Sequence, residues 1–195
     1  MILIRHGESE FNVHYAATRR DPGIRDPKLT DKGHTQVRDA ARFIADLEAA
    51  RGLTTILSSP YTRTLQTAEI LAEHLNLPIA VDVQIGEHAH FTCDIGTPRS
   101  QLRDLWPSVT FDHLDEEWWP EGEDNSAVST RAAGFRSHAA GRDDWHRLLI
   151  VSHWGFIRGL TGHRVPNAAV LRFDPLAPHP TGADILSPAE LAQDA

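Results

Sequence analysis

Residues 1–12 read Met-Ile-Leu-Ile-Arg-His-Gly-Glu-Ser-Glu-Phe-Asn, so a short apolar strand leads directly into a polar loop. Arg5 and His6 follow the predicted strand 1–4 without a spacer. In an open α/β sheet, ligands bind in the crevice at the carboxyl ends of the strands. We therefore expect this loop to lie at a functional edge of the sheet.

Three later apolar strands also end beside side chains that can do chemistry. These are strand 54–58 followed by Arg63, strand 79–83 followed by Glu87, and strand 147–152 followed by His153. Because the carboxyl ends of parallel strands meet at one edge, we expect the five groups to converge. A fifth strand is predicted at 168–173, at an edge of the sheet.

Helical patterns separate the strands. Apolar residues recur at helical spacing over 31–50, where Thr30 is the expected N-cap, and over 126–140, which ends at Gly141. Ser59 is expected to cap a third helix that has Pro60 as its first residue and runs toward Pro78. Alternating strands and helices predict a three-layer α/β/α sandwich with a mainly parallel central sheet.

The length of 195 residues favours one domain, here placed at 1–175 with a C-terminal tail at 176–195. Segment 86–124 interrupts the alternation, and an insertion of this size is typical of a lid or specificity region. Within it, Thr97 and Pro98 predict the start of a short helix. In the tail, Ser187-Pro188-Ala189-Glu190 predicts another.

Composition excludes several classes of protein. The net charge of −8 argues against binding to nucleic acid or to an anionic membrane surface. Cys93 is the single cysteine, so no internal disulfide can form and a reducing cytoplasm is the expected compartment. No apolar run approaches the 18 residues or so of a membrane span.

The first loop has the parts of a nucleophilic phosphate site. A neutral imidazole at His6 can attack phosphorus when a hydrogen bond holds its other nitrogen, and neighbouring cations favour the neutral form. Gly7 allows the backbone to approach an anion closely, and Ser9 and Asn12 add neutral donors. Arg5 supplies a guanidinium that can bind a phosphoryl group.

The later groups complete that chemistry. Arg63 lies in the first turn of a helix, where a cation is disfavoured unless an anion binds there. His153, if protonated, would add positive charge to the transferring group. Glu87, near these cations, would protonate the leaving oxygen and then activate water.

The chain resembles a known family, the histidine phosphatase superfamily of the phosphoglycerate mutase-like, branch 1 type. The resemblance covers residues 2–160 in the family's chain order and rests on these segments: Leu3-Ile4-Arg5-His6-Gly7-Glu8-Ser9-Glu10-Phe11-Asn12, Leu29-Thr30-Asp31-Lys32-Gly33, Ser58-Ser59-Pro60-Tyr61-Thr62-Arg63-Thr64, Glu87 and Val151-Ser152-His153. It implies a phosphohistidine intermediate on His6. It also implies a phosphate clamp of Arg5, Arg63 and His153, with Asn12 lining the pocket and Glu87 as proton donor. No metal or organic cofactor is implied.

Two features depart from the family pattern. Trp154 follows the second histidine where a small residue is usual, so its backbone N–H would reach the phosphate while its ring narrows the pocket. The run 112–124 is acidic and contains Trp118 and Trp119. We expect its acids to face solvent over the two packed tryptophans.

The favoured function is a metal-independent phosphomonoesterase that acts on a small phosphorylated molecule. A cofactor-dependent phosphoglycerate mutase is the alternative, although only Arg99 and Arg103 would add positive charge near the insertion. A noncatalytic phospho-ligand binding module is a third possibility, but such a module needs no His6 and Glu87 together. His88 and His90 are close in sequence, but without HExxH-type spacing they do not predict a metal site.

Overall fold

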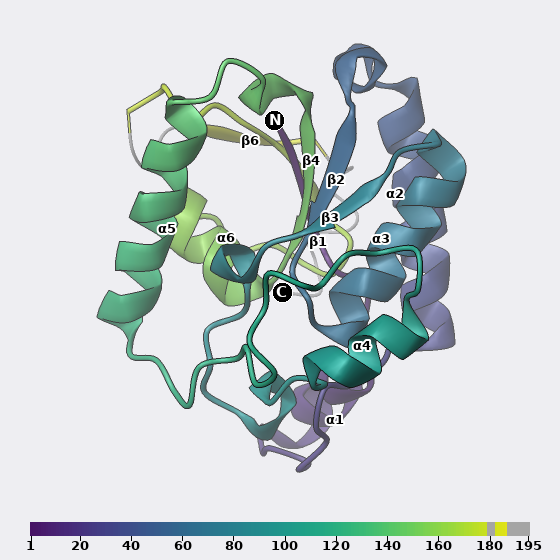
Figure 1. Cartoon of the computed structure of the whole chain (residues 1–195), viewed down its shortest axis with the longest axis vertical. Coiled ribbons are helices and arrows are strands. Elements are labelled where there is room, and N and C mark those ends of the chain that lie inside the picture. The colour runs from purple at the N-terminus through teal and green to yellow at the C-terminus, as the bar shows by residue number, and fades with distance from the viewer. Residues whose placement is uncertain (179–181, 187–195) are drawn as a thin grey trace.

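The structure, a computed structural model, describes residues 1–178 and 182–186. In this part of the chain, six strands form one sheet in the order β3-β2-β4-β1-β5-β6 (Figure 1). The strands are β1 Ile2–Arg5, β2 Thr55–Ser58, β3 Ile79–Val81, β4 Leu148–Ser152, β5 Val170–Phe173 and β6 Ala183–Ile185. The four strands expected from residues 1–152 are all present.

The first four strands pair in parallel, as the sequence predicted. β4 lies between β1 and β2, and β2 also pairs with β3. β5 and β6 join antiparallel to this group. The predicted edge position of β5 was wrong, because β6, from the segment predicted as the tail, pairs with its outer side. A strand of three residues after a proline-rich stretch carries too little pattern to be recognised.

Helices cover both faces of the sheet, which confirms the three-layer sandwich. Figure 1 shows α2 and α3 on one side and α5 and α6 on the other. Ile2 and Ile4 of β1 pack in the core beneath α2 and α3, whereas Leu3 packs with residues of α5 and α6. The helices are α1 Glu10–Thr18, α2 Asp31–Asp46, α3 Thr62–Leu75, α4 Arg99–Leu105, α5 Asn125–Ala140 and α6 Trp154–Thr161.

Short 3₁₀ turns join several of these elements: η1 Glu48–Gly52, η2 Val83–Ile85, η3 Thr92–Asp94 and η4 Trp145–Arg147. The predicted N-cap of α2 is confirmed, because Thr30 Oγ1 accepts the Gly33 N–H at 3.0 Å. Helix α2 stops at Asp46, however, and η1 replaces its predicted last turn. The predicted helix 126–140 is α5, with Gly141 at its C-cap.

Two predicted caps were wrong, and one carboxylate explains both. Helix α3 begins at Thr62, not at Pro60, because Ser59 still bonds to Val151 O and continues β2. Asp26 accepts the Thr62 N–H at 2.8 Å and so replaces a local cap. Thr97 does not cap α4 either, because its hydroxyl donates to Asp26 at 2.6 Å.

Two further helices were not predicted. Helix α1 buries only Phe11 of its nine residues, so it has no apolar stripe that sequence reasoning could detect. Helix α6 starts immediately after β4 and is eight residues long. The predicted helix at Ser187-Pro188-Ala189-Glu190 lies outside the described residues.

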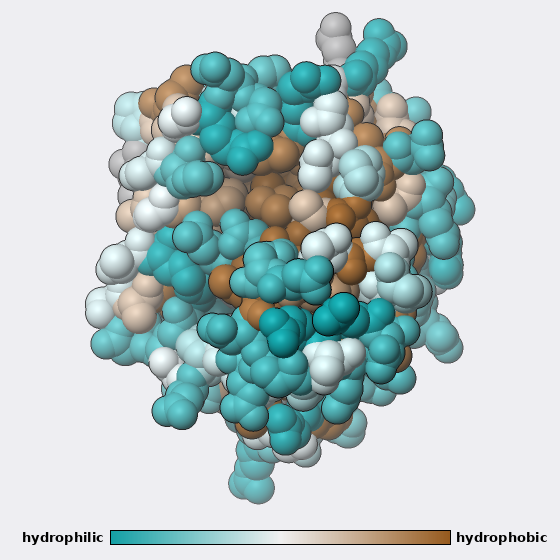
Figure 2. Space-filling view, in the orientation of Figure 1, coloured by the Kyte–Doolittle hydropathy of each residue, from teal (hydrophilic) through white to brown (hydrophobic). Residues whose placement is uncertain are grey.

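Segment 86–124 forms a folded layer against α3 and β3. Leu102, Trp106 and Phe111 are buried with Leu65 and Val81. The acids Asp112, Asp115, Glu116, Glu117 and Glu121 are exposed, while Trp118 and Trp119 are half-buried. The expectation that the acids of this run face solvent over packed tryptophans is confirmed for these five and is wrong for Glu123, whose side chain is 10% exposed and pairs with Arg131 at 2.7 Å. Hydrophilic residues dominate the lower half of the face in Figure 2.

No helix within residues 1–178 and 182–186 has the length and apolar character that crossing a membrane requires.

Candidate active site

Parallel pairing brings the two predicted catalytic histidines together. β1 and β4 are neighbours in register, with Arg5 opposite Ser152, so the residues that follow each strand also lie side by side. The His6 N–H donates to Ser152 O at 3.0 Å. The ring centroids of His6 and His153 are 5.2 Å apart although the residues are 147 positions apart in sequence.

The backbone selects the tautomer of His6. Its Nδ1 lies 2.7 Å from Gly7 O, and a carbonyl can only accept, so Nδ1 carries the hydrogen. Nε2 therefore keeps its lone pair. Burial lowers the pKa of His6 well below its usual value, and the charges of Arg63 and Arg5 lower it further. The imidazole is a neutral base with one free nitrogen.

His153 is fully buried at the N-cap of α6. Its Nε2 lies 2.9 Å from Ser59 Oγ, and its Nδ1 has no hydrogen-bond partner among the described residues. Burial, followed by the charge of Arg63, lowers its pKa well below the usual value. The surroundings thus favour a neutral ring, whereas the sequence analysis considered a protonated one.

The two arginines are held in different ways. Arg5 Nη1 donates to Val165 O at 2.8 Å, but its buried Nε has no partner in the described chain. Burial lowers the pKa of Arg5 to about 10, so it stays charged at neutral pH. Arg63 donates to Cys93 O at 2.9 Å and to the Asp94 carboxylate at 3.2 Å. Both guanidinium groups add positive charge around His6.

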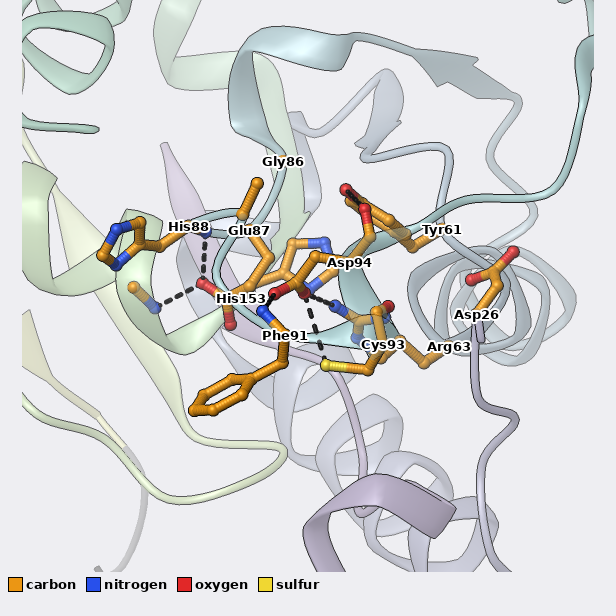
Figure 3. A network of polar contacts seen from close by, with 12 residues as sticks. Asp26, Tyr61, Arg63, Gly86, Glu87, His88, Phe91, Cys93, Asp94 and His153 are labelled. Carbon is orange, nitrogen blue, oxygen red and sulfur yellow. Dashed lines mark hydrogen bonds and ion pairs between the residues drawn. The ribbon is translucent and has the colours of Figure 1, made fainter. Parts of the chain in front are cut away.

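Glu87 sits against the start of α6. Its Oε1 accepts the Gly155 N–H at 2.7 Å and the His88 N–H at 2.9 Å (Figure 3). Burial raises its pKa, and the negative charge of Asp94 raises it further, although Arg63 and the His88 N–H act against this. The group is thus biased toward the protonated form that a proton donor needs.

The small residue after the second histidine is displaced by one position, and this affects Glu87. A Cβ at Gly155 would lie 2.5 Å from Glu87 Oε1 and 2.8 Å from His88 Cβ, so any larger residue there would displace the Glu87 carboxyl. Trp154 takes the preceding position, and its ring packs on Arg158 one turn along α6, at 5.3 Å from the guanidinium carbon. The ring that the sequence analysis expected to narrow the pocket thus has a partner on its own helix.

Ser9 and Asn12 interact mainly with each other. Ser9 is the N-cap of α1, and the Asn12 side-chain carbonyl accepts from the N–H and the hydroxyl of Ser9. Asn167 Nδ2 donates to the same carbonyl at 3.1 Å. The Ser9 hydroxyl therefore caps α1. The side-chain carbonyl of Asn12 faces Ser9 and Asn167, which donate to it.

Four residues of the network in and around the site were not predicted as site residues. Asp94 pairs with Arg63, and the Ser59 hydroxyl contacts His153. The Tyr61 ring lies 4.6 Å from the Arg63 guanidinium carbon. Asn167 donates to His6 O at 3.1 Å and to Gly7 O at 3.3 Å. Asp94, Ser59 and Asn167 act through contacts with residues distant in sequence, which neither spacing nor periodicity reveals.

Two hollows lie near the site. One of about 360 Å³ is bordered by residues 89–92, 94–95 and 120–123, with Asp94 in its wall. A larger one of about 580 Å³ lies between α3 and α4 beside Asp26. His6 lines neither, so the convergence of side chains, and not cavity size, identifies the candidate site.

The described residues contain no cluster of three side chains that could hold a metal ion. The rings of His88 and His90 are 5.8 Å apart, but His88 Nε2 is already bonded to Glu123 O at 2.8 Å.

Comparison with known proteins decides the family. The model of the histidine phosphatase superfamily (branch 1) matches residues 1–190. The chain belongs to the histidine phosphatase superfamily. Members of this family are enzymes that include phosphatases and probable phosphoglycerate mutases.

Two curated relatives of this histidine phosphatase carry different names. One is a probable phosphoglycerate mutase, GpmB, of Proteus mirabilis (strain HI4320), 30% identical over 154 residues that cover 77% of this chain and 67% of the relative. The other is phosphoserine phosphatase 1 of Hydrogenobacter thermophilus (strain DSM 6534 / IAM 12695 / TK-6), 30% identical over 156 residues that cover 78% and 70%.

Among solved structures, the mycobacterial glucosyl-3-phosphoglycerate phosphatase Rv2419c in complex with VO3 resembles this histidine phosphatase with a TM-score of 0.60. It is 22% identical and the match covers 96% of this chain and 97% of that one. At this identity the likeness supports the shared fold.

Proposed function

We propose that this histidine phosphatase hydrolyses a small phosphomonoester through a phosphohistidine formed on His6. The observation that carries the proposal is a set of buried nitrogens without protein partners. Arg5 Nε and His153 Nδ1 are buried and unbonded in the described chain, and the free Nε2 of His6 belongs to the adjoining ring. Buried polar atoms normally have partners, so phosphate oxygens explain the unbonded nitrogens of Arg5 and His153, while the lone pair of His6 Nε2 is left to attack phosphorus.

In the first step, the lone pair of His6 Nε2 forms the N–P bond while the bond from phosphorus to the leaving oxygen breaks. Glu87 gives its proton to that oxygen, and the product alcohol leaves. Arg5 and Arg63 neutralise charge on the phosphoryl oxygens. His153 Nδ1 also contributes a donor if the Ser59 hydroxyl donates to Nε2.

In the second step, Glu87, now a carboxylate, accepts a proton from water as the water oxygen bonds to phosphorus. The N–P bond breaks, its electrons return to His6, and inorganic phosphate is released. The backbone N–H of Trp154, at the N-terminus of α6, would help to bind the phosphate, and Asn12 would present its amide group from α1. The favourable end of a helix dipole supports that placement.

The insertion favours hydrolysis over mutase chemistry. Arg99 contacts Glu116 and Leu114 O, and Arg103 pairs with Asp112, so both cations are neutralised within the segment. A mutase must hold a doubly phosphorylated intermediate, which needs additional free positive charge. We therefore regard residues 86–124 as a specificity region within the catalytic domain 1–175. The cytoplasm remains the compartment predicted from the sequence.

The test is hydrolysis of 4-nitrophenyl phosphate in the presence of EDTA across pH 5–8. We expect turnover by the native enzyme, a loss of at least about 10³-fold in His6→Ala, and little change in the control His138→Ala, an exposed histidine on α5. Absence of turnover in folded enzyme would contradict the proposal. Faster isomerisation of phosphoglycerate with a bisphosphate primer than hydrolysis would favour the mutase alternative.

A further inference from the structure

Asp94 is a second buried acid beside the candidate catalytic groups. It ends the turn η3 and is 3% exposed. One carboxylate oxygen, Oδ1, lies 3.2 Å from Arg63 Nη2. The other, Oδ2, accepts the N–H groups of His90 and Phe91, each at 3.1 Å (Figure 3). All of these contacts are direct, so the carboxylate is fixed.

We propose that Asp94 is a positioning residue that holds the Arg63 guanidinium, weakens its attraction for the product phosphate and opposes the ionised form of Glu87. This rests on the proposed function, because it assigns Arg63 to the phosphoryl group and Glu87 to proton transfer. Asp94 would thus favour product release and acid catalysis at the same site.

Contacts around Arg63 support the first part. The backbone of the turn adds an acceptor, Cys93 O, at 2.9 Å from Nη1. The Tyr61 ring lies against the guanidinium, and its hydroxyl donates to Asp94 O at 2.8 Å. Two nitrogens of the Arg63 guanidinium are therefore hydrogen-bonded to the turn that contains Asp94, and one face of the group packs on Tyr61. These contacts fix the orientation of the guanidinium.

Charge supports the second part. The Arg63–Asp94 pair is buried, with side-chain exposures of 3% and 2%, so solvent screens it poorly. A phosphate dianion approaching Arg63 meets this carboxylate as well as the cation. Repulsion between the two anions reduces affinity for phosphate, which is the product and a competitive ligand of the site.

The surroundings of Glu87 support the third part. The groups that face it are Asp94 on η3, Arg63 on α3, Arg5 at the end of β1, the N–H groups of His88 and Gly155, and Arg131 of α5, which donates to Glu87 O at 3.1 Å. His6 and His153 are biased to their neutral forms and add little charge. Glu123 pairs with Arg131 at 2.7 Å, so Asp94 is the acid whose charge opposes Arg63 and Arg5 around Glu87.

The experiment compares Asp94→Asn with Asp112→Asn, an exposed acid in the same segment that pairs with Arg103 at 3.6 Å. Inorganic phosphate binding is measured by calorimetry, and kcat is measured from pH 5 to 9. For Asp94→Asn we expect phosphate to bind roughly 3- to 10-fold more tightly and the alkaline limb of kcat to move to lower pH. Asp112→Asn should leave both unchanged.

Two further variants separate charge from structure. Asp94→Ser also removes the charge and should reproduce the shift, whereas Asp94→Glu keeps the charge and should retain the native alkaline limb. Unchanged or weaker phosphate binding together with an unmoved limb would overturn the inference. Failure of both neutral variants to fold would assign Asp94 a purely structural role and would overturn it too.

The calorimetric readout does not depend on turnover. If the native enzyme binds phosphate but hydrolyses no ester, the proposed function fails, while tighter binding by Asp94→Asn still supports the effect of Asp94 on Arg63.

Discussion

At the scale of single residues, the backbone prepares His6 without help from a carboxylate. Gly7 O takes the Nδ1 hydrogen, and Asn167 donates to the same oxygen and to His6 O. The sequence indicated His6 as the candidate nucleophile because it directly follows a strand. Asn167 could not be recognised, since it reaches the loop from 160 positions away.

Replacing Glu87 by Gln tests the proton donor, because glutamine keeps the shape but cannot give up a proton. We expect kcat/KM for an alkyl phosphate to fall by about 10²- to 10³-fold and that for 4-nitrophenyl phosphate by less than about tenfold. The aryl oxide is a good leaving group and needs little protonation. Steady-state kinetics with both esters measure the difference, and equal losses would remove Glu87 from the acid role.

Gly155→Ala tests how Glu87 is held. The added methyl would lie 2.5 Å from Glu87 Oε1, so the carboxyl must move and lose its bond to the Gly155 N–H. We expect alkyl phosphate hydrolysis to fall by about 10- to 100-fold, since small misplacements of catalytic groups are costly.

The matched control for that variant is Gly134→Ala, in the middle of α5, where an added Cβ meets no atom within 4 Å. Activity should be unchanged, and the free energy of unfolding should rise by about 0.5–1 kcal/mol because alanine favours the helix. Full activity in Gly155→Ala would show that Glu87 needs no fixed position.

At the scale of elements, prediction succeeded where a pattern was local and failed where a distant residue replaced it. Strand–helix alternation and the Thr30 cap were both local signals. The starts of α3 and α4 were misplaced because Asp26, remote in sequence, accepts hydrogen bonds from Thr62 and Thr97. Such a cap depends on tertiary structure and leaves no trace in the helix that it serves.

Asp26→Ala tests that shared cap. The substitution leaves the N–H and hydroxyl groups of Thr62 and Thr97 without their acceptor at a buried position. We expect the free energy of unfolding to fall by about 2–3 kcal/mol, as loss of a cap and of buried hydrogen bonds requires. Urea denaturation measures it, with Asp31→Ala in the exposed first turn of α2 as a control. A change below about 0.5 kcal/mol would contradict the shared role.

At the scale of the whole molecule, parallel strand order gathers groups that the chain keeps far apart. The residue that follows each strand could be identified from the local sequence, and parallel pairing then implied that these side chains lie near one another. The order of strands at the antiparallel edge could not be predicted, because β6 is short and its partner β5 looked terminal. The candidate residues lie at the carboxyl ends of the parallel strands, and this is why the sequence could place them near one another.

Burying two histidines at this site has a consequence for the stability of the whole fold. Both His6 and His153 have pKa values well below 6.5 when folded, so between pH 6.5 and those values the unfolded chain binds more protons than the native one. Stability is then lost as pH falls below about 6.5. The raised pKa of Glu87 acts in the opposite direction, since the native state holds that proton above pH 4.5.

The Met1 ammonium group, whose pKa burial lowers to about 5, also takes up a proton on unfolding, so three groups act against the one carboxyl and stability falls as the pH falls from 7.5 to 5.5. Urea denaturation at pH 7.5, 6.5 and 5.5 measures this slope. The variant His6→Asn, which removes one of the two titrating rings, should flatten it, whereas His138→Asn on the exposed face of α5 should not. A flat profile in the native enzyme would mean that the buried rings take up protons inside the fold, and the neutral nucleophile would lose its physical basis.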